Sequence, residues 1–126
     1  MQDAVEFLGR KSSEELVLLY QKCKIFIFPS TIETFGNPLL EAMACGAPIA
    51  CSNTAAMPEI AKDAALYFNP VEPDDIARKI IQLTEDKVLL KSLSQKSLAR
   101  AELFSWEVTA EKTIKVIKSA SISQKM

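Results

Sequence analysis

The stretch that decides the fold runs from Pro29 to Gly46 and reads PSTIETFGNPLLEAMACG. Its first half has the composition of a loop, and its second half that of a short helix. Asn37 is a favoured N-cap residue, Pro38 suits the first helical position, and Gly46 can end the helix in a left-handed conformation. The backbone N–H groups at this helix start are predicted to form a site for a phosphate or a carboxylate.

Glu41 is the only charged residue between Leu39 and Cys51. A helix that is apolar on all sides is typically buried, and an ionised carboxylate is costly there without a partner. Glu33 lies on the other side of the same loop, and carboxylates accept hydrogen bonds from hydroxyl groups. A phosphate site between two such acceptors fits a ligand with sugars on both sides of a diphosphate. The alternatives are a solvated charge for Glu33 and a carboxylate satisfied within the protein for Glu41.

Short hydrophobic runs alternate with helical patterns along the chain. Strands are predicted at residues 4–9, 24–29, 47–51 and 64–68. Helices are predicted to begin near Ser12 or Ser13, Asn37, Met57, Pro73, Asp86 and Ser105. The run 24–29 does not alternate, which indicates a strand buried on both faces. We therefore expect a single α/β domain over residues 1–126: an open, parallel, Rossmann-like sheet of about four strands with flanking helices and a helical C-terminal tail, frayed over residues 119–126.

Ligands of open parallel sheets bind beyond the carboxyl ends of the strands. The loops Gly9–Lys11, Ser30–Asn37 and Ser52–Thr54 are all expected at that edge. Arg10 and Lys11 have the charge to bind phosphate or to stack on a base, although a basic pair in a loop is more often a solvated surface charge.

Composition excludes several classes of function. Fifteen basic residues against sixteen acidic ones give no excess of positive charge for nucleic acid or for an anionic membrane. The chain contains no histidine, which rules out Ser–His and Cys–His catalysis and a histidine metal site within it. The three cysteines lack paired spacing and are expected to be reduced, small hydrophobes. Without a signal peptide pattern or an apolar membrane span, we expect a cytoplasmic protein.

Glu33, seven intervening residues and Glu41 closely resemble the glutamate-x7-glutamate signature of GT-B retaining glycosyltransferases of the group 1, or family 4, type. The resemblance extends on both sides of this signature over residues 4–118. The further matching stretches are Phe7-Leu8-Gly9, Ser13-Glu14-Glu15-Leu16, Phe28-Pro29-Ser30, Ala42 to Ile49, Pro58-Glu59 and Phe104-Ser105-Trp106-Glu107. They resemble the C-terminal, nucleotide-sugar-binding domain of that family, in its order.

The resemblance implies a role for each matching residue. Glu33 matches the catalytic-site glutamate placed at the donor sugar, and Glu41 matches the one that accepts hydrogen bonds from the ribose hydroxyls. The amides that match the loop around the sugar and the diphosphate are those of Phe35, Gly36, Asn37 and Leu39. Gly9, Arg10 and Lys11 match the loop beside the base. Family members transfer a hexose from a nucleotide sugar to a glycan or lipid acceptor, as in polysaccharide biosynthesis, and generally need no divalent metal or other cofactor.

Parts of the family pattern have no match in this chain. A complete member has an N-terminal domain that binds the acceptor, and further strand-helix units with an arginine and a lysine that neutralise the diphosphate. We therefore expect weak binding of nucleotide sugars, no transfer by the isolated chain, and membrane contact only through parts outside this stretch. The alternative is a non-catalytic remnant that acts as an interaction module and forms a homodimer through an exposed sheet edge.

Overall fold

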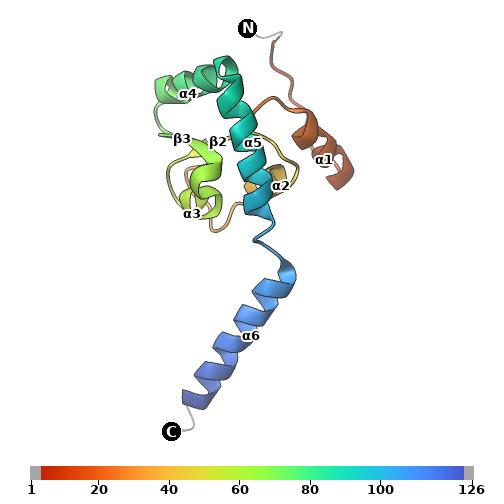
Figure 1. Ribbon diagram of the computed structural model, residues 1–126, viewed down its shortest axis with the longest axis vertical. Coiled ribbons are helices and arrows are strands. Elements are labelled where there is room, and N and C mark those ends of the chain that lie inside the picture. Colours follow the sequence, from red (N-terminus) through yellow and green to blue (C-terminus); the bar gives the residue numbers. More distant parts are fainter. Residues whose placement is uncertain (1–3, 124–126) are drawn as a thin grey trace.

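The computed structural model describes the backbone of residues 4–123 and the side chains through Ser121 (Figure 1). Its elements along the chain are α1 (Ser13–Lys22), β1 (Phe26–Phe28), α2 (Asn37–Ala44), β2 (Ile49–Ser52), α3 (Met57–Ala61), the short 3-10 helix η2 (Lys62–Ala64), β3 (Ala65–Phe68), α4 (Pro73–Glu85), α5 (Lys87–Ala101) and α6 (Trp106–Ser123). The predicted α/β class with an open parallel sheet is confirmed.

The sheet has three strands within the described residues, in the order β1-β2-β3, and both pairs are parallel. Phe26 of β1 pairs with Ile49 of β2, and Ile49 pairs in turn with Ala65 of β3. Each crossover between neighbouring strands carries a helix, α2 after β1 and α3 after β2. Parallel strands require such crossovers, and the sequence has just enough chain between the runs to form them.

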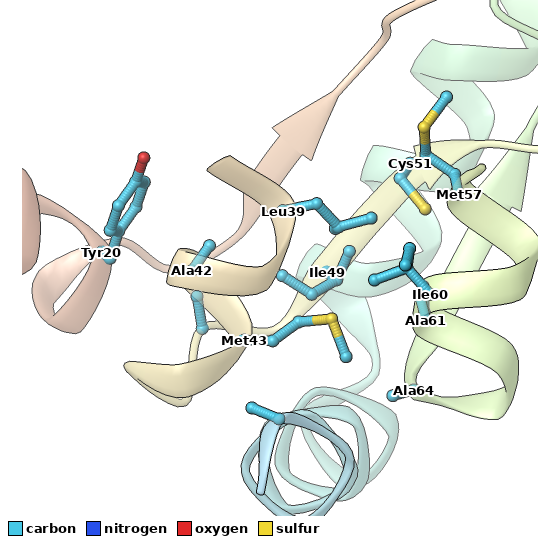
Figure 2. Packing of buried hydrophobic residues seen from close by; sticks show 13 residues of the cluster. Tyr20, Leu39, Ala42, Met43, Ile49, Cys51, Met57, Ile60, Ala61 and Ala64 are labelled. Carbon is cyan, nitrogen blue, oxygen red and sulfur yellow. The ribbon is translucent and has the colours of Figure 1, made fainter. Parts of the chain in front are cut away.

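Strand β2 is the centre of the core, because all four of its residues are buried. Ile49 and Cys51 face one hydrophobic cluster, together with Leu39 and Met43 of α2 and Ile60 of α3. Figure 2 shows these side chains gathered between α2, β2 and α3. On the opposite face of the strand, Ala50 contacts a second cluster, which contains Phe68, Leu83 and Leu93. Successive residues of a strand point to opposite faces, so helices cover β2 on both sides.

Strand β1 is less buried than the sequence pattern indicates. Ile27 retains 37% of its exposure, and Phe26 and Phe28 are only half-buried. The expectation of burial on both faces is therefore wrong for this strand. The reason is its position: β1 pairs only with β2, and within residues 4–123 it lies at the edge of the sheet.

The strand predicted at residues 4–9 is also wrong. This segment is irregular chain that leads into α1 (Figure 1), and Phe7 is 95% exposed. A strand needs a neighbour for its backbone N–H and C=O groups. No described strand pairs with this segment, so its β-forming composition has no ladder to join.

Side-chain caps start three helices where the sequence predicted them. Ser12 and Glu15 form a capping box at α1. Asp86 accepts a hydrogen bond from the N–H of Leu89 at 2.8 Å, and Ser105 accepts one from the N–H of Val108 at 3.1 Å. These caps satisfy N–H groups that the helices leave free, and so they fix the beginnings of α1, α5 and α6.

Helix α5 crosses the end of α2 and locks its position. The Ser94 hydroxyl donates to the carbonyl oxygen of Gly46 at 2.6 Å, and a Cβ added to Gly46 would lie 3.3 Å from Leu98. Gly46 has φ +77°, which confirms the predicted left-handed end of this helix. The helix that begins at the candidate site is therefore held at its far end by α5.

Helix α6 projects away from the body of the protein (Figure 1). Trp106 at its start is 83% exposed, and the helix continues to Ser123, into the stretch that was expected to fray. Residues 124–126 lie outside the described part. None of the described helices is long and apolar enough to cross a membrane.

Candidate functional site

The loop between β1 and α2 enters the helix through Gly36, which has φ +89° and is the N-cap. Asn37 is the first helical residue, so the prediction that its side chain caps the helix is wrong by one position. Glycine adopts this left-handed conformation without the steric cost that a Cβ brings, and it starts the helix without a side-chain cap. Pro38 lies in the first turn, where a missing N–H leaves no hydrogen bond unmade.

The backbone N–H groups at this helix start fall into two sets. Those of Leu39 and Leu40 donate to the carbonyl oxygen of Gly36 at 3.0 and 3.3 Å. The Leu39 amide, expected to face a ligand, is therefore already used. The N–H groups of Phe35, Gly36 and Asn37 donate to no acceptor among residues 4–123. These three groups lie at the positive end of the α2 dipole, where they can bind an anion.

Glu33 is half-buried in the same loop, and one of its oxygens accepts a hydrogen bond from the Ser30 hydroxyl at 3.2 Å. The same hydroxyl lies 3.1 Å from the carbonyl oxygen of Ile32. Ser30 thus holds the Glu33 carboxylate near the end of β1. Its second oxygen accepts no hydrogen bond within the described residues and is available to a ligand hydroxyl.

Glu41 is exposed, contrary to the expectation that its helix is buried on all sides. Helical spacing turns Leu39, Ala42 and Met43 into the core and leaves Glu41 facing outward. The hydroxyl of Tyr20 on α1 donates to one carboxylate oxygen at 3.4 Å. Burial raises the pKa of the Tyr20 hydroxyl, and the nearby Glu41 carboxylate raises it further. Tyr20 therefore stays protonated and remains a hydrogen-bond donor to Glu41.

A cavity of about 590 Å³ opens beside Glu41, between α2 and the start of α6. Its walls come from two distant parts of the chain: Phe35, Asn37, Leu40, Glu41 and Ala44, and Ala101, Phe104, Ser105, Trp106 and Thr109. The second set was not predicted as part of the site. The only sequence signal for it was the Phe104-Ser105-Trp106 stretch, which was noted for its resemblance to the family.

The loop Gly9–Lys11 does not join this arrangement. Arg10 is exposed, and Lys11 pairs with Glu15 of α1 at 3.6 Å. Within residues 4–123, no hydrogen bond or ion pair links this loop to Ser30–Asn37, and none of its residues lines the cavity beside Glu41. Within residues 4–123 no strand precedes this loop, so no ladder holds it at the edge of the sheet. A role of this loop beside a base stays a prediction.

The three cysteines are free thiols whose pKa values are raised by burial. Cys51 is buried in β2, and burial raises the pKa of its thiol to about 12. Burial also raises the pKa of the half-buried Cys23 and Cys45 thiols. All three are free thiols, as expected. Among the residues that the structure describes, no cluster of three or more cysteine, aspartate or glutamate side chains could hold a metal ion.

Comparisons with known proteins agree with this architecture. The family described as "Glycosyl transferases group 1" matches residues 1–100. The O-antigen chain mannosyltransferase B of Escherichia coli is 39% identical over 114 residues, which cover 90% of this chain and 30% of that protein. The MMP alpha-(1->4)-mannosyltransferase of Mycolicibacterium hassiacum is 32% identical, over 94% of this chain and 30% of that protein.

A solved structure shares the fold. The sucrose-phosphate synthase of Thermosynechococcus elongatus superposes with a TM-score of 0.83 at 27% identity, over 96% of this chain and 31% of that one. The chain thus spans less than a third of the length of these proteins. It belongs to the group 1 glycosyltransferases, as part of the C-terminal domain of the GT-B fold.

Proposed function

We propose that this chain forms the nucleotide-sugar-binding part of a retaining glycosyltransferase that transfers a hexose to a glycan or lipid acceptor. The observation that carries the proposal is the arrangement around Gly36. Three N–H groups without an acceptor within residues 4–123 lie in a loop flanked by the carboxylates of Glu33 and Glu41. Such N–H groups suit a diphosphate, and carboxylates suit sugar hydroxyls. The cavity of about 590 Å³ beside Glu41 lies within the usual size range of small-molecule sites.

Each group has a distinct role in this proposal. Glu33 is the catalytic-site residue and lies against the donor sugar. Glu41 accepts hydrogen bonds from the ribose hydroxyls, and the Tyr20 hydroxyl donates to the same carboxylate. The N–H groups of Phe35, Gly36 and Asn37 hold the diphosphate. Two of the relatives are mannosyltransferases by name, which makes mannose a good first choice of donor sugar to test.

Two further points of the proposal concern metal ions and the acceptor. We propose that donor binding needs no divalent metal, so that a chelator leaves the affinity unchanged. The acceptor is bound by a further domain, in keeping with the share of the relatives that this chain covers. The cytoplasmic location expected from the sequence stays a prediction.

Titration calorimetry on the complete chain tests the proposal. The probes are uridine and guanosine diphosphate sugars, mannosyl donors included, with and without EDTA. We expect weak binding of at least one of them and no turnover. Glu41→Gln should weaken that binding about tenfold, because loss of a hydrogen bond to a charged group costs about 1.5 kcal/mol or more.

Glu85→Gln is the matched control for this experiment. Glu85 is exposed at the end of α4 and makes no hydrogen bond or ion pair within residues 4–123. Its substitution should leave the affinity as it is. Absence of binding by any probe at millimolar concentration, or equal losses in both variants, would contradict the proposed function.

The edge of the sheet supports a second candidate, a self-associating interaction module. Strand β1 has one hydrogen-bonded neighbour within the described residues, and Ile27 on it is 37% exposed. An unpaired edge is a template for another strand. Light scattering at high concentration would then detect a dimer, and Ile27→Lys would dissociate it while Glu41→Gln would not. A monomer under these conditions would rule this candidate out.

A further inference from the structure

Arg100, near the end of α5, ties that helix to the end of α3. Its Nε donates to the carbonyl oxygen of Ile60 at 2.8 Å, and its Nη2 donates to that of Glu59 at 3.0 Å. The last carbonyl groups of a helix lack partners within the helix and carry partial negative charge. The guanidinium group satisfies two of them at once, and this fixes its plane and its position.

The same guanidinium group lies against an aromatic ring. Its Cζ is 5.0 Å from the centroid of Phe104, a distance typical of a cation–π contact. The backbone of Phe104 is also held, since its N–H donates to the carbonyl oxygen of Ala101 at 3.0 Å. Phe104 is half-buried in the turn between α5 and α6. Its ring is therefore fixed on one side by Arg100 and at its base by the turn.

The Phe104 ring also contacts the candidate site. Phe104 and Phe35 meet edge to face, with ring centroids 6.0 Å apart and an angle of 74° between the planes. Aromatic rings favour this geometry. Phe35 directly precedes Gly36, and within the described residues Phe104 is its only aromatic partner. Both rings also line the cavity that contains Glu41.

The loop needs such an anchor for a physical reason. Glycine moves readily between conformations, and Gly36 starts α2 without a side-chain cap. The three N–H groups with no acceptor within residues 4–123 gain no rigidity from hydrogen bonds of their own. Two amides of α2 hold the Gly36 carbonyl, and the contacts of Phe35 hold the chain before it; together they decide where these N–H groups point.

We propose that Phe104, held by Arg100, is a positioning residue for the β1–α2 loop. It fixes Phe35 and so aims the N–H groups of Phe35, Gly36 and Asn37 at the diphosphate of a nucleotide sugar. This proposal rests on the proposed function for the identity of the ligand. The anchoring itself is a property of the chain without ligand.

The first test is the ¹⁵N relaxation of the complete, ligand-free chain with Phe104→Leu. We expect the order parameters of the Phe35, Gly36 and Asn37 amides to fall from about 0.85 to below about 0.6, the range of flexible backbone. Phe104→Tyr keeps the ring and should restore them. Leu103→Ala is the matched control, because Leu103 is the exposed neighbour of Phe104 and lines no part of the cavity.

A second pair of variants covers the case in which Phe104→Leu does not fold. Phe35 is 38% exposed, so Phe35→Leu should fold normally and loosen the same amides. Arg100→Gln should loosen them to a lesser extent, since it removes the charge over the ring. Unchanged order parameters in Phe35→Leu and in any folded Phe104 variant would overturn the proposal.

Nucleotide-sugar affinity distinguishes a positioning role of Phe104 from a purely structural one. Among variants that still fold, Phe104→Leu should weaken nucleotide-sugar binding about tenfold, and Phe104→Tyr should bind like the wild type. If the wild-type chain binds no nucleotide sugar, the proposed function fails while the relaxation experiment still decides the anchoring. If binding is lost with the loop still rigid, the positioning role is wrong.

Discussion

Two loops with the same local signals have different surroundings. Gly9–Lys11 and Ser30–Asn37 each contain a glycine with positive φ, +64° and +89°, and each leads into a helix. The sequence placed both at one edge of the sheet. The second loop follows a paired strand, precedes a helix with a buried face, and touches Phe104 through Phe35. The first follows unpaired chain, and a Cβ added to Gly9 would meet nothing within 4 Å. The local sequence signals of the two loops are alike. Only Ser30–Asn37 is held by a paired strand, a helix with a buried face and an aromatic contact.

Substituting valine for each of the two glycines should give the largest difference in stability between the loops. Gly36→Val puts a β-branched residue at φ +89° in a buried position whose carbonyl oxygen accepts two hydrogen bonds, and it should cost roughly 2–3 kcal/mol and abolish nucleotide-sugar binding. Gly9→Val puts the same residue at φ +64° in an exposed loop with open space around it. This substitution should cost only about 0.5 kcal/mol. Chemical denaturation measures both values. Equal losses would mean that the Gly9 loop is as constrained as the Gly36 loop.

Alkaline pH tests the sheet beneath the second loop. The pKa of Cys51 is about 12 in the folded chain, because burial disfavours the thiolate, and 9.0 for a free thiol. A raised folded pKa gives stability that is complete below pH 9 and is lost as pH rises toward 12. At pH 10 the loss from this group should be about 1.4 kcal/mol.

Two alanine variants separate Cys51 from the other thiols in urea denaturation at pH 7 and pH 10. Cys51→Ala should reduce the dependence on pH, while Cys23→Ala, at the half-buried end of α1, should reduce it less. Parallel stability curves for the wild type and Cys51→Ala between these two pH values would contradict the expectation.

Tyr20→Phe tests how much the Tyr20 hydroxyl contributes to the candidate site. The substitution removes the hydroxyl that donates to Glu41 at 3.4 Å and keeps the ring, which packs edge to face on Phe26. A long hydrogen bond to an exposed carboxylate orients it only modestly. We expect about a threefold loss of nucleotide-sugar affinity, or about 0.6 kcal/mol, with little change in melting temperature. A loss as large as that of Glu41→Gln would mean that Tyr20 itself binds the ligand.

Arg10→Gln is the smallest expected effect and the direct test of the first loop. Arg10 is exposed, and its loop makes no hydrogen bond or ion pair to Ser30–Asn37 within residues 4–123. Salt screens an exposed charge of this kind, so the affinity should fall less than about twofold at physiological ionic strength. A tenfold loss in calorimetry would instead place this loop at the ligand, as the family resemblance implies.

Local signals predicted much of the fold. Ser12 (with Ser13 as the alternative), Asp86 and Ser105 were predicted as caps because a side-chain oxygen before a helical pattern satisfies a free N–H group. The strand prediction for residues 4–9 was wrong because a strand needs a neighbouring strand to pair with. Composition does not reveal whether such a neighbour is present. The prediction of Asn37 as the cap was wrong because it relied on the capping side chain, whereas the chain starts the helix with the left-handed backbone of Gly36.

The geometry of the candidate site could be read from the sequence only in part, and the roles of its residues stay predictions. The spacing of Glu33 and Glu41 on either side of a helix start is local and could be read directly. The use of the Leu39 amide by Gly36 is a detail of backbone geometry that no residue type announces. Phe104 meets Phe35 across most of the length of the chain, and such a pair can be found only in the folded protein.

The order β1-β2-β3 has a consequence for how this chain is made on the ribosome. Strands β2 and β3 each pair with the strand synthesised just before them, so each pair can form as soon as its second strand has emerged. Because short-range closures cost less entropy, we expect β1 and β2 to pair before α5 has left the exit tunnel. Limited proteolysis of ribosome-bound chains of increasing length would follow this order. Early protection of α5 and a late appearance of the sheet would contradict it.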